Sequence, residues 1–138
     1  MENESSIKIV SEWDIVAARQ LGRNLAKELG FGTVDQARIT TAISELARNI
    51  YLYAGKGEIR FELVNKFDKK GLKIIAVDHG PGIQDIRRAM EDGFSTSGGL
   101  GAGLPGVKRL MDDFDLITSL GEGTTIWVVK WLRERRFG

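Results

Sequence analysis

The sequence predicts an α+β two-layer sandwich, in which a mixed or antiparallel sheet is covered on one face by helices. Its first half holds two long segments with apolar residues three or four apart, the pattern of helices with one buried face. Its second half holds pairs of short apolar segments separated by glycine-containing turns, the pattern of hairpins. Long helices followed by hairpins favour helices layered on one face of a sheet over alternating βαβ units.

We expect a short strand to lead into the first helix. Residues 7–10 are mostly β-branched, and Ser11 with Asp14 three residues later matches a capping box. The helix should end near Gly30 and bury one face, made of Ala18, Leu21, Leu25 and Leu29.

The second helix is expected to run from a cap at Thr33 to about Tyr53. Apolar residues again recur at helical spacing, and this stripe should face the core. Its members are Ile39, Ile43, Leu46, Ile50 and Tyr53.

The remaining elements are two hairpins around a glycine-rich segment. Strands at 58–66 and 72–77 should be joined by a turn at 68–71, and strands at 115–119 and 124–131 by a turn at 121–123. Between the hairpins, the segment 80–106 carries a short helical candidate at 85–91. A further helix is expected at about 104–111, where Pro105 is tolerated because the first helical turn makes no use of its N–H group.

Composition limits the function classes. The length of 138 residues fits one domain, and 42% apolar with 28% charged residues is typical of a folded globular chain. The net charge of +1 and the scattered basic residues argue against nucleic acid as a partner. Because cysteine, a secretory leader pattern and a long apolar run are missing, we expect a cytoplasmic protein without membrane contact. The single histidine, His79, excludes any Ser-His-Asp triad that does not use it.

Glu45 and Asn49 stand one helical turn apart in the second helix, so both can face a site that the helix lines. The carboxylate of Glu45 can accept a proton from an attacking hydroxyl, and the amide oxygen of Asn49 is a hard ligand suited to Mg²⁺. The alternative is that both belong to a solvated helix face.

Asp78 follows a predicted strand and should project into a cleft beyond it. Gly80 and Gly82 permit a tight turn and a close approach of the backbone to a ligand. An ordinary surface turn is the alternative, because Asp, Pro and Gly are all turn residues.

Gly99, Gly101 and Gly103 precede the helix expected to begin near Leu104. Backbone N–H groups of such a loop, together with a helix N-terminus, form an anion site suited to a triphosphate. A flexible linker is the alternative. A dinucleotide fold is rejected because no strand precedes the GxGxxG match, and a P-loop is rejected because Val107 stands where that motif needs lysine.

Four segments in this order resemble the N box and the glycine boxes of the GHKL ATPases, which have the Bergerat fold. They are residues 45–49 (ELARN), 78–82 (DHGPG), 99–103 (GLGAG) and 121–124 (GEGT). The resemblance implies one histidine-kinase-like ATPase domain over residues 1–138. It also implies that Glu45 is the catalytic base, that Asn49 binds magnesium, that Asp78 binds the adenine amino group, and that Thr124 contacts the nucleotide.

Within this superfamily the chain resembles the stand-alone serine/threonine kinases of stress signalling, because it has neither a spare histidine on a dimerising hairpin nor transducing domains. The resemblance implies a kinase that uses ATP and Mg²⁺ to phosphorylate STAS-domain proteins and, once released, binds and activates a PP2C-type phosphatase. The alternatives are a non-catalytic, nucleotide-dependent anti-sigma factor or binding module, and a metabolic ATPase.

Overall fold

The computed structural model describes residues 4–84, 89–90 and 103–133. Along the chain, the strands and helices are β1 (Glu4–Ile9), α1 (Glu12–Leu29), α2 (Thr33–Asn49), the π-helical turn η1 (Ile50–Ala54), β2 (Gly57–Lys66), β3 (Lys69–Asp78), α4 (Gly103–Leu110), β4 (Asp113–Ser119) and β5 (Gly123–Trp131). The predicted α+β class is confirmed. The helix expected at 85–91 lies outside the described residues except for Ala89 and Met90.

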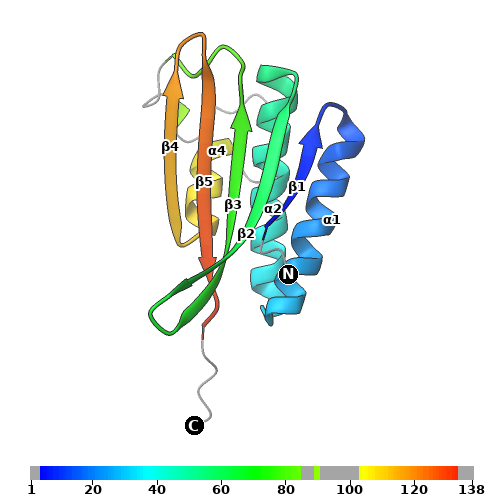
Figure 1. The fold of residues 1–138 in the computed structure, drawn as a ribbon, viewed down its shortest axis with the longest axis vertical. Helices are drawn as coiled ribbons and strands as arrows, with labels where there is room; N and C mark the ends of the chain where they lie inside the picture. The colour runs from blue at the N-terminus through cyan, green and yellow to red at the C-terminus, as the bar shows by residue number, and fades with distance from the viewer. Residues whose placement is uncertain (1–3, 85–88, 91–102, 134–138) are drawn as a thin grey trace.

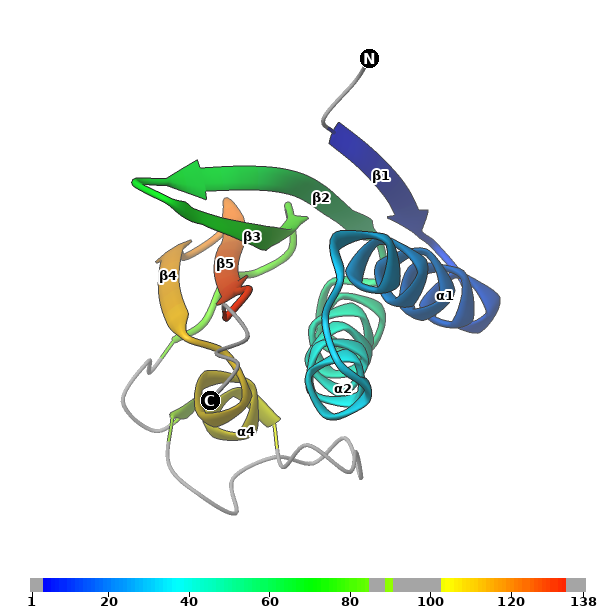
Figure 2. The same ribbon diagram turned by 90° about the horizontal axis from the view of Figure 1, so that it is seen from below.

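The sheet has the strand order β1-β2-β3-β5-β4, and all neighbouring strands are antiparallel. It is therefore antiparallel and not mixed. Figures 1 and 2 show α1, α2 and α4 on the same face of this sheet, as expected for a two-layer sandwich. The core lies between the layers, and Ile43, Phe61, Ile74 and Val128 are among its buried residues.

The start of α1 is the capping box that the sequence predicts. The carboxylate of Asp14 accepts the N–H groups of Val10 at 2.8 Å and of Ser11 at 2.9 Å. The hydrogen bond from Val10, assisted by those from Ser11, holds the pKa of Asp14 below its ordinary value. The helix ends as expected at Gly30, which has a left-handed φ of 102°.

The two long helices approach each other closely at Gly22 of α1. A Cβ at this position would lie 2.1 Å from Cδ1 of Ile43 on α2. The absent side chain therefore lets Ile43 reach the core between α1, α2 and the sheet.

The second helix differs from its prediction at both ends. Its N-cap is Gly32, and Thr33 is already the first helical residue. The α-helix ends at Asn49 and widens into η1, where the N–H of Gly55 donates to the carbonyl of Ile50 at 2.9 Å. Tyr53 was expected on the buried face, but it is 53% exposed.

The first hairpin is longer than predicted. Its strands pair as far as Lys66 and Lys69, so the turn consists of Phe67 and Asp68 and not of residues 68–71. Gly71 is a paired strand residue. The ends of α4, β4 and β5 differ from the expected ones by one or two residues. No helix within the described ranges has the length and apolarity to span a membrane.

Candidate functional site

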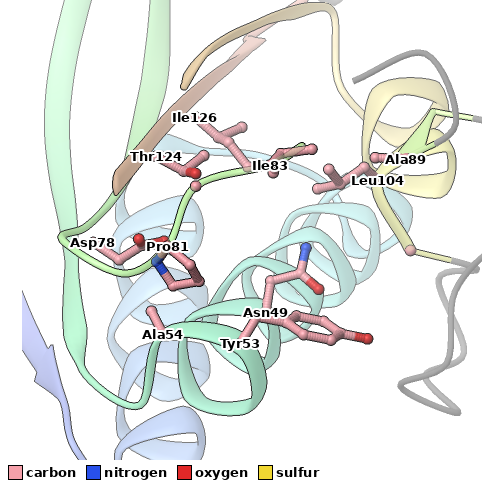
Figure 3. A pocket seen from close by; sticks show the side chains of 12 residues that line it. Asn49, Tyr53, Ala54, Asp78, Pro81, Ile83, Ala89, Leu104, Thr124 and Ile126 are labelled. Atoms are coloured by element: carbon pink, nitrogen blue, oxygen red, sulfur yellow. The ribbon is translucent and has the colours of Figure 1, made fainter. Parts of the chain in front are cut away.

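A cleft of about 340 Å³ lies where the end of the sheet meets α2, η1 and α4 (Figure 3). Strands β3 and β5, the loop after β3, and the three helical elements all contribute to it. Its lining residues are Asn49, Tyr53, Ala54, Asp78, Pro81, Gly82, Ile83, Ala89, Gly103, Leu104, Thr124 and Ile126.

Asp78 is the last residue of β3 and is placed by the strand register. It lies directly opposite Thr124 on β5, so both side chains stand on the same face of the sheet. One carboxylate oxygen, Oδ1, accepts the N–H of Gly80 at 2.9 Å. A carboxylate has about four acceptor positions, so this bond orients Asp78 and leaves it able to accept a hydrogen bond from a ligand.

The turn after β3 packs tightly enough to require glycine at two positions. Gly82 has a φ of 80°, and a Cβ there would lie 2.6 Å from the carbonyl oxygen of Ser119. A Cβ on Gly80 would lie 2.6 Å from Cβ of Ala54 in η1. Gly82 lines the cleft, whereas Gly80 acts through its hydrogen bond to Asp78.

Thr118 on β4 holds this turn in place, and our sequence reasoning missed it. Its hydroxyl oxygen accepts the N–H of Ile83 at 2.9 Å, lies 2.9 Å from the hydroxyl of Thr124, and lies 3.2 Å from the carbonyl oxygen of Gly123. A hydroxyl has one proton, so when Thr118 donates to Gly123, Thr124 must donate to Thr118. The oxygen of Thr124 then keeps acceptor capacity toward the cleft. The signal for Thr118 was its pairing with Thr124 across β4 and β5, which only the register reveals.

The opposite wall comes from the end of α2. Asn49 is its last residue, and Figure 3 shows its side chain beside Tyr53 of η1. The wide turn of η1 places Tyr53 and Ala54 at the cleft. Such π-helical turns occur frequently at functional sites.

Glu45 lies one turn before Asn49, but it is not among the residues that line the cleft. Its side chain is 1% exposed, and its Oε1 accepts a hydrogen bond from Nη1 of Arg48 at 3.2 Å. The side chain of Arg48 is one-third exposed, so the ion pair runs from the interior towards the surface. The catalytic role of Glu45 stays a prediction.

Gly103 and Leu104 form the N-terminus of α4 at the cleft. The first N–H groups of a helix have no partner within the helix and, with the helix dipole, favour an anion. Gly99 and Gly101 lie outside the described residues. The cleft thus brings together six of the predicted residues, namely Asn49, Asp78, Gly82, Gly103, Leu104 and Thr124.

The chain is similar to several known proteins. It is 76% identical to the serine/threonine-protein kinase RsbT of Bacillus subtilis, over 96% of this chain and 100% of that protein. It is 28% identical to the anti-sigma F factor of Caldanaerobacter subterraneus, over 86% of each chain. The crystal structure of the RsbU and RsbW domains of Rv1364c from Mycobacterium tuberculosis superimposes with a TM-score of 0.64 at 17% identity, over 97% of this chain and 34% of that one. This last likeness concerns the fold alone.

The family comparison agrees with the geometry of the cleft. Residues 34–135 match the model of the histidine kinase-, DNA gyrase B- and HSP90-like ATPases. This range contains the end of α2, the turn after β3, α4 and the last hairpin, which together surround the cleft. The resemblance to the GHKL ATPases is therefore confirmed, and the chain belongs to the histidine kinase-, DNA gyrase B- and HSP90-like ATPase family.

Proposed function

We propose that the chain is an ATP-dependent protein kinase that phosphorylates serine or threonine on a STAS-domain partner. The observation that carries the proposal is the 76% identity, over nearly the whole chain, to a serine/threonine-protein kinase. This identity bears out the kinase class predicted from the sequence.

The adenine is proposed to bind at the end of the sheet. The carboxylate of Asp78 would accept a hydrogen bond from the adenine amino group, with the Thr124 hydroxyl beside it. Two apolar side chains of the sheet and of the loop after β3, those of Ile126 and Ile83, also line this cleft and suit the faces of a base. The cleft therefore combines apolar walls with a small number of polar groups, as small-molecule sites commonly do.

The phosphates are proposed to lie toward the N-terminus of α4, where Gly103 and Leu104 reach the cleft. Gly99 and Gly101 would contribute further backbone N–H groups. The amide oxygen of Asn49 would serve as a ligand of Mg²⁺, an ion that usually keeps substrate phosphates and water among its ligands. The bound ion would neutralise charge on the phosphates during transfer.

Glu45 is the proposed general base, because it lies one helical turn from Asn49 and carries the only carboxylate in the segment 45–49. It would accept the proton of the attacking hydroxyl as the phosphoryl group moves to that oxygen. The Glu45 side chain is buried, and its carboxylate accepts a hydrogen bond from Arg48 at 3.2 Å. Glu45 would therefore act on the hydroxyl of the protein substrate from a buried position.

The proposed partners are a STAS-domain protein as the substrate and a PP2C-type phosphatase that the released kinase binds and activates. We further propose that the protein works in the cytoplasm as a single domain over residues 1–138. The 28% identity to an anti-sigma F factor supports a second candidate function, that of a nucleotide-dependent binding module.

The test is to incubate the purified chain with γ-labelled ATP, Mg²⁺ and a STAS-domain protein. We expect label on a serine or threonine of that protein, and none when this acceptor is replaced by alanine. ATP binding without transfer would favour the binding module, and steady ATP hydrolysis without a protein partner would favour a metabolic ATPase.

A further inference from the structure

Lys130 on β5 is a buried lysine to which the proposed reaction assigns no role. It is 5% exposed and lies on the sheet face that carries the helices. Burying an ammonium group is costly unless it is paired and hydrogen-bonded. The contacts of Lys130 therefore indicate what the charge does.

Those contacts join two helices. Nζ donates a hydrogen bond to the carbonyl oxygen of Leu110, the last residue of α4, at 2.8 Å. It lies 3.8 Å from Oδ1 of Asp35 in the first turn of α2, and 3.7 Å from Oδ1 of Asp112 just after α4. A cation at this place also suits the negative C-terminal end of the α4 dipole.

These contacts lie at the opposite ends of both helices from the cleft. The helix α2 runs from Asp35 in its first turn to Asn49 at the cleft, and α4 runs from Gly103 at the cleft to Leu110 beside Lys130. The helix α4 has only eight residues, a length of about 12 Å at 1.5 Å per residue. A change in its tilt at Leu110 therefore moves its N-terminus at the cleft.

We propose that Lys130 is a positioning residue that sets α4 against α2 and so places the α4 N-terminus where it meets the phosphates of ATP. The inference rests on the proposed nucleotide site. It concerns the phosphate end alone, because the adenine end is built by Asp78 and Thr124 on the sheet and by the turn that Thr118 holds.

The variant Lys130→Met tests this proposal, with the affinities for ATP and for adenosine measured by calorimetry. Methionine has an unbranched side chain of similar length, but it is apolar and therefore removes both the hydrogen bond and the charge. We expect ATP affinity to fall about tenfold or more, because small misplacements of binding groups have large effects, while adenosine affinity stays within about twofold. The matched control is Lys73→Met on the neighbouring strand, whose ammonium lies over the Trp127 ring on the other sheet face. This control should keep both affinities.

Equal losses of ATP and adenosine affinity, or no loss of either, would overturn the role of Lys130. If Lys130→Met does not fold, Asp112→Asn decides the question. It keeps an acceptor for the N–H of Trp131, now bound by Oδ2 of Asp112 at 2.8 Å, and weakens the pairing with Lys130. The same selective loss for ATP supports the proposal, and an unchanged ratio of the two affinities contradicts it. A wild-type chain that binds no ATP would instead refute the proposed function.

Discussion

Asp78 and Thr124 face each other directly across the β3–β5 pair, and both line the cleft. Their pairing belongs to a continuous register from Gly71–Trp131 to Asp78–Thr124. A slip of one residue would turn every side chain of a strand to the other face, so the buried face of the sheet fixes this register. The adenine end of the proposed site is thus part of the rigid sheet.

Replacing Asp78 by asparagine should weaken ATP binding about 10- to 100-fold, because the site loses a charged acceptor and gains a donor that can face the adenine amino group. Calorimetric titration of the variant with ATP measures the loss. Asp68→Asn is the control, since Asp68 is exposed in the turn at the other end of β3. A folded Asp78 variant with wild-type affinity would remove Asp78 from the site.

Thr118→Val should destabilise the chain by about 1–3 kcal/mol, because the N–H of Ile83 loses its acceptor. ATP affinity should also fall, since the turn carrying Gly82 and Ile83 would no longer be held against β4. Urea unfolding and ATP titration measure the two effects. Thr125→Val makes the same chemical change on the opposite face of β5, and it should preserve ATP affinity. Wild-type binding by Thr118→Val would show that the turn needs no such anchor.

Glu45→Gln and Asn49→Ala should separate chemistry from binding. Glutamine keeps the shape of Glu45 and cannot act as the base, so phosphoryl transfer should slow about 10²-fold or more while ATP stays bound. Loss of the Asn49 amide should weaken Mg-ATP binding and transfer together. Single-turnover transfer assays with parallel ATP titrations distinguish these outcomes, and Glu62→Gln on β2 is the control. Full activity of Glu45→Gln would refute the base assignment and leave the nucleotide site intact.

Asp14 should make stability depend on pH. Its folded-state pKa is lowered chiefly by the Val10 hydrogen bond, so its contribution is present above the unfolded-state pKa of about 3.9 and is lost as the pH falls through the folded-state value. Asp14→Asn should therefore be less stable than wild type at pH 7. The difference between their free energies of unfolding should decrease as the pH falls from about 5 to about 2. Urea unfolding across this range tests the prediction. A difference that stays constant with pH would contradict it.

The proposed partners should compete for the kinase. A chain of 138 residues has room for few interfaces of about 800 Å² per partner, so the STAS-domain protein and the phosphatase should not bind together. Phosphorylation adds almost two negative charges to the STAS contact, and repulsion from the bound triphosphate should weaken it. An aspartate at the acceptor position should shift the kinase to the phosphatase in a co-elution assay. A ternary complex, or equal affinity for modified and unmodified partner, would refute this switch.

Local patterns in the sequence predicted most of the fold. The capping box at Ser11, the helix end at Gly30 and the strand that ends at Asp78 depend on neighbours in the chain, and all three were expected. The π-helical turn after Asn49 was not, because helical periodicity does not distinguish a widened turn from a continuing helix. The two-residue turn at Phe67 was missed for a similar reason, since the charged and glycine residues that follow it are typical of turns yet belong to β3 here.

The sequence by itself indicated the family, because Glu45, Asn49, Asp78 and the glycine segments, in this order along the chain, resemble the boxes of the GHKL ATPases, and residues 34–135 match the model of that family. Only the tertiary structure decided which of these residues meet. Strand register set Asp78 opposite Thr124 and brought Thr118 to the turn at Ile83. Packing between elements buried Glu45 and joined Lys130 to both α2 and α4. The physical reason is that these contacts join residues on different elements, whose alignment follows from burial of the whole core and cannot be read from spacing along the chain.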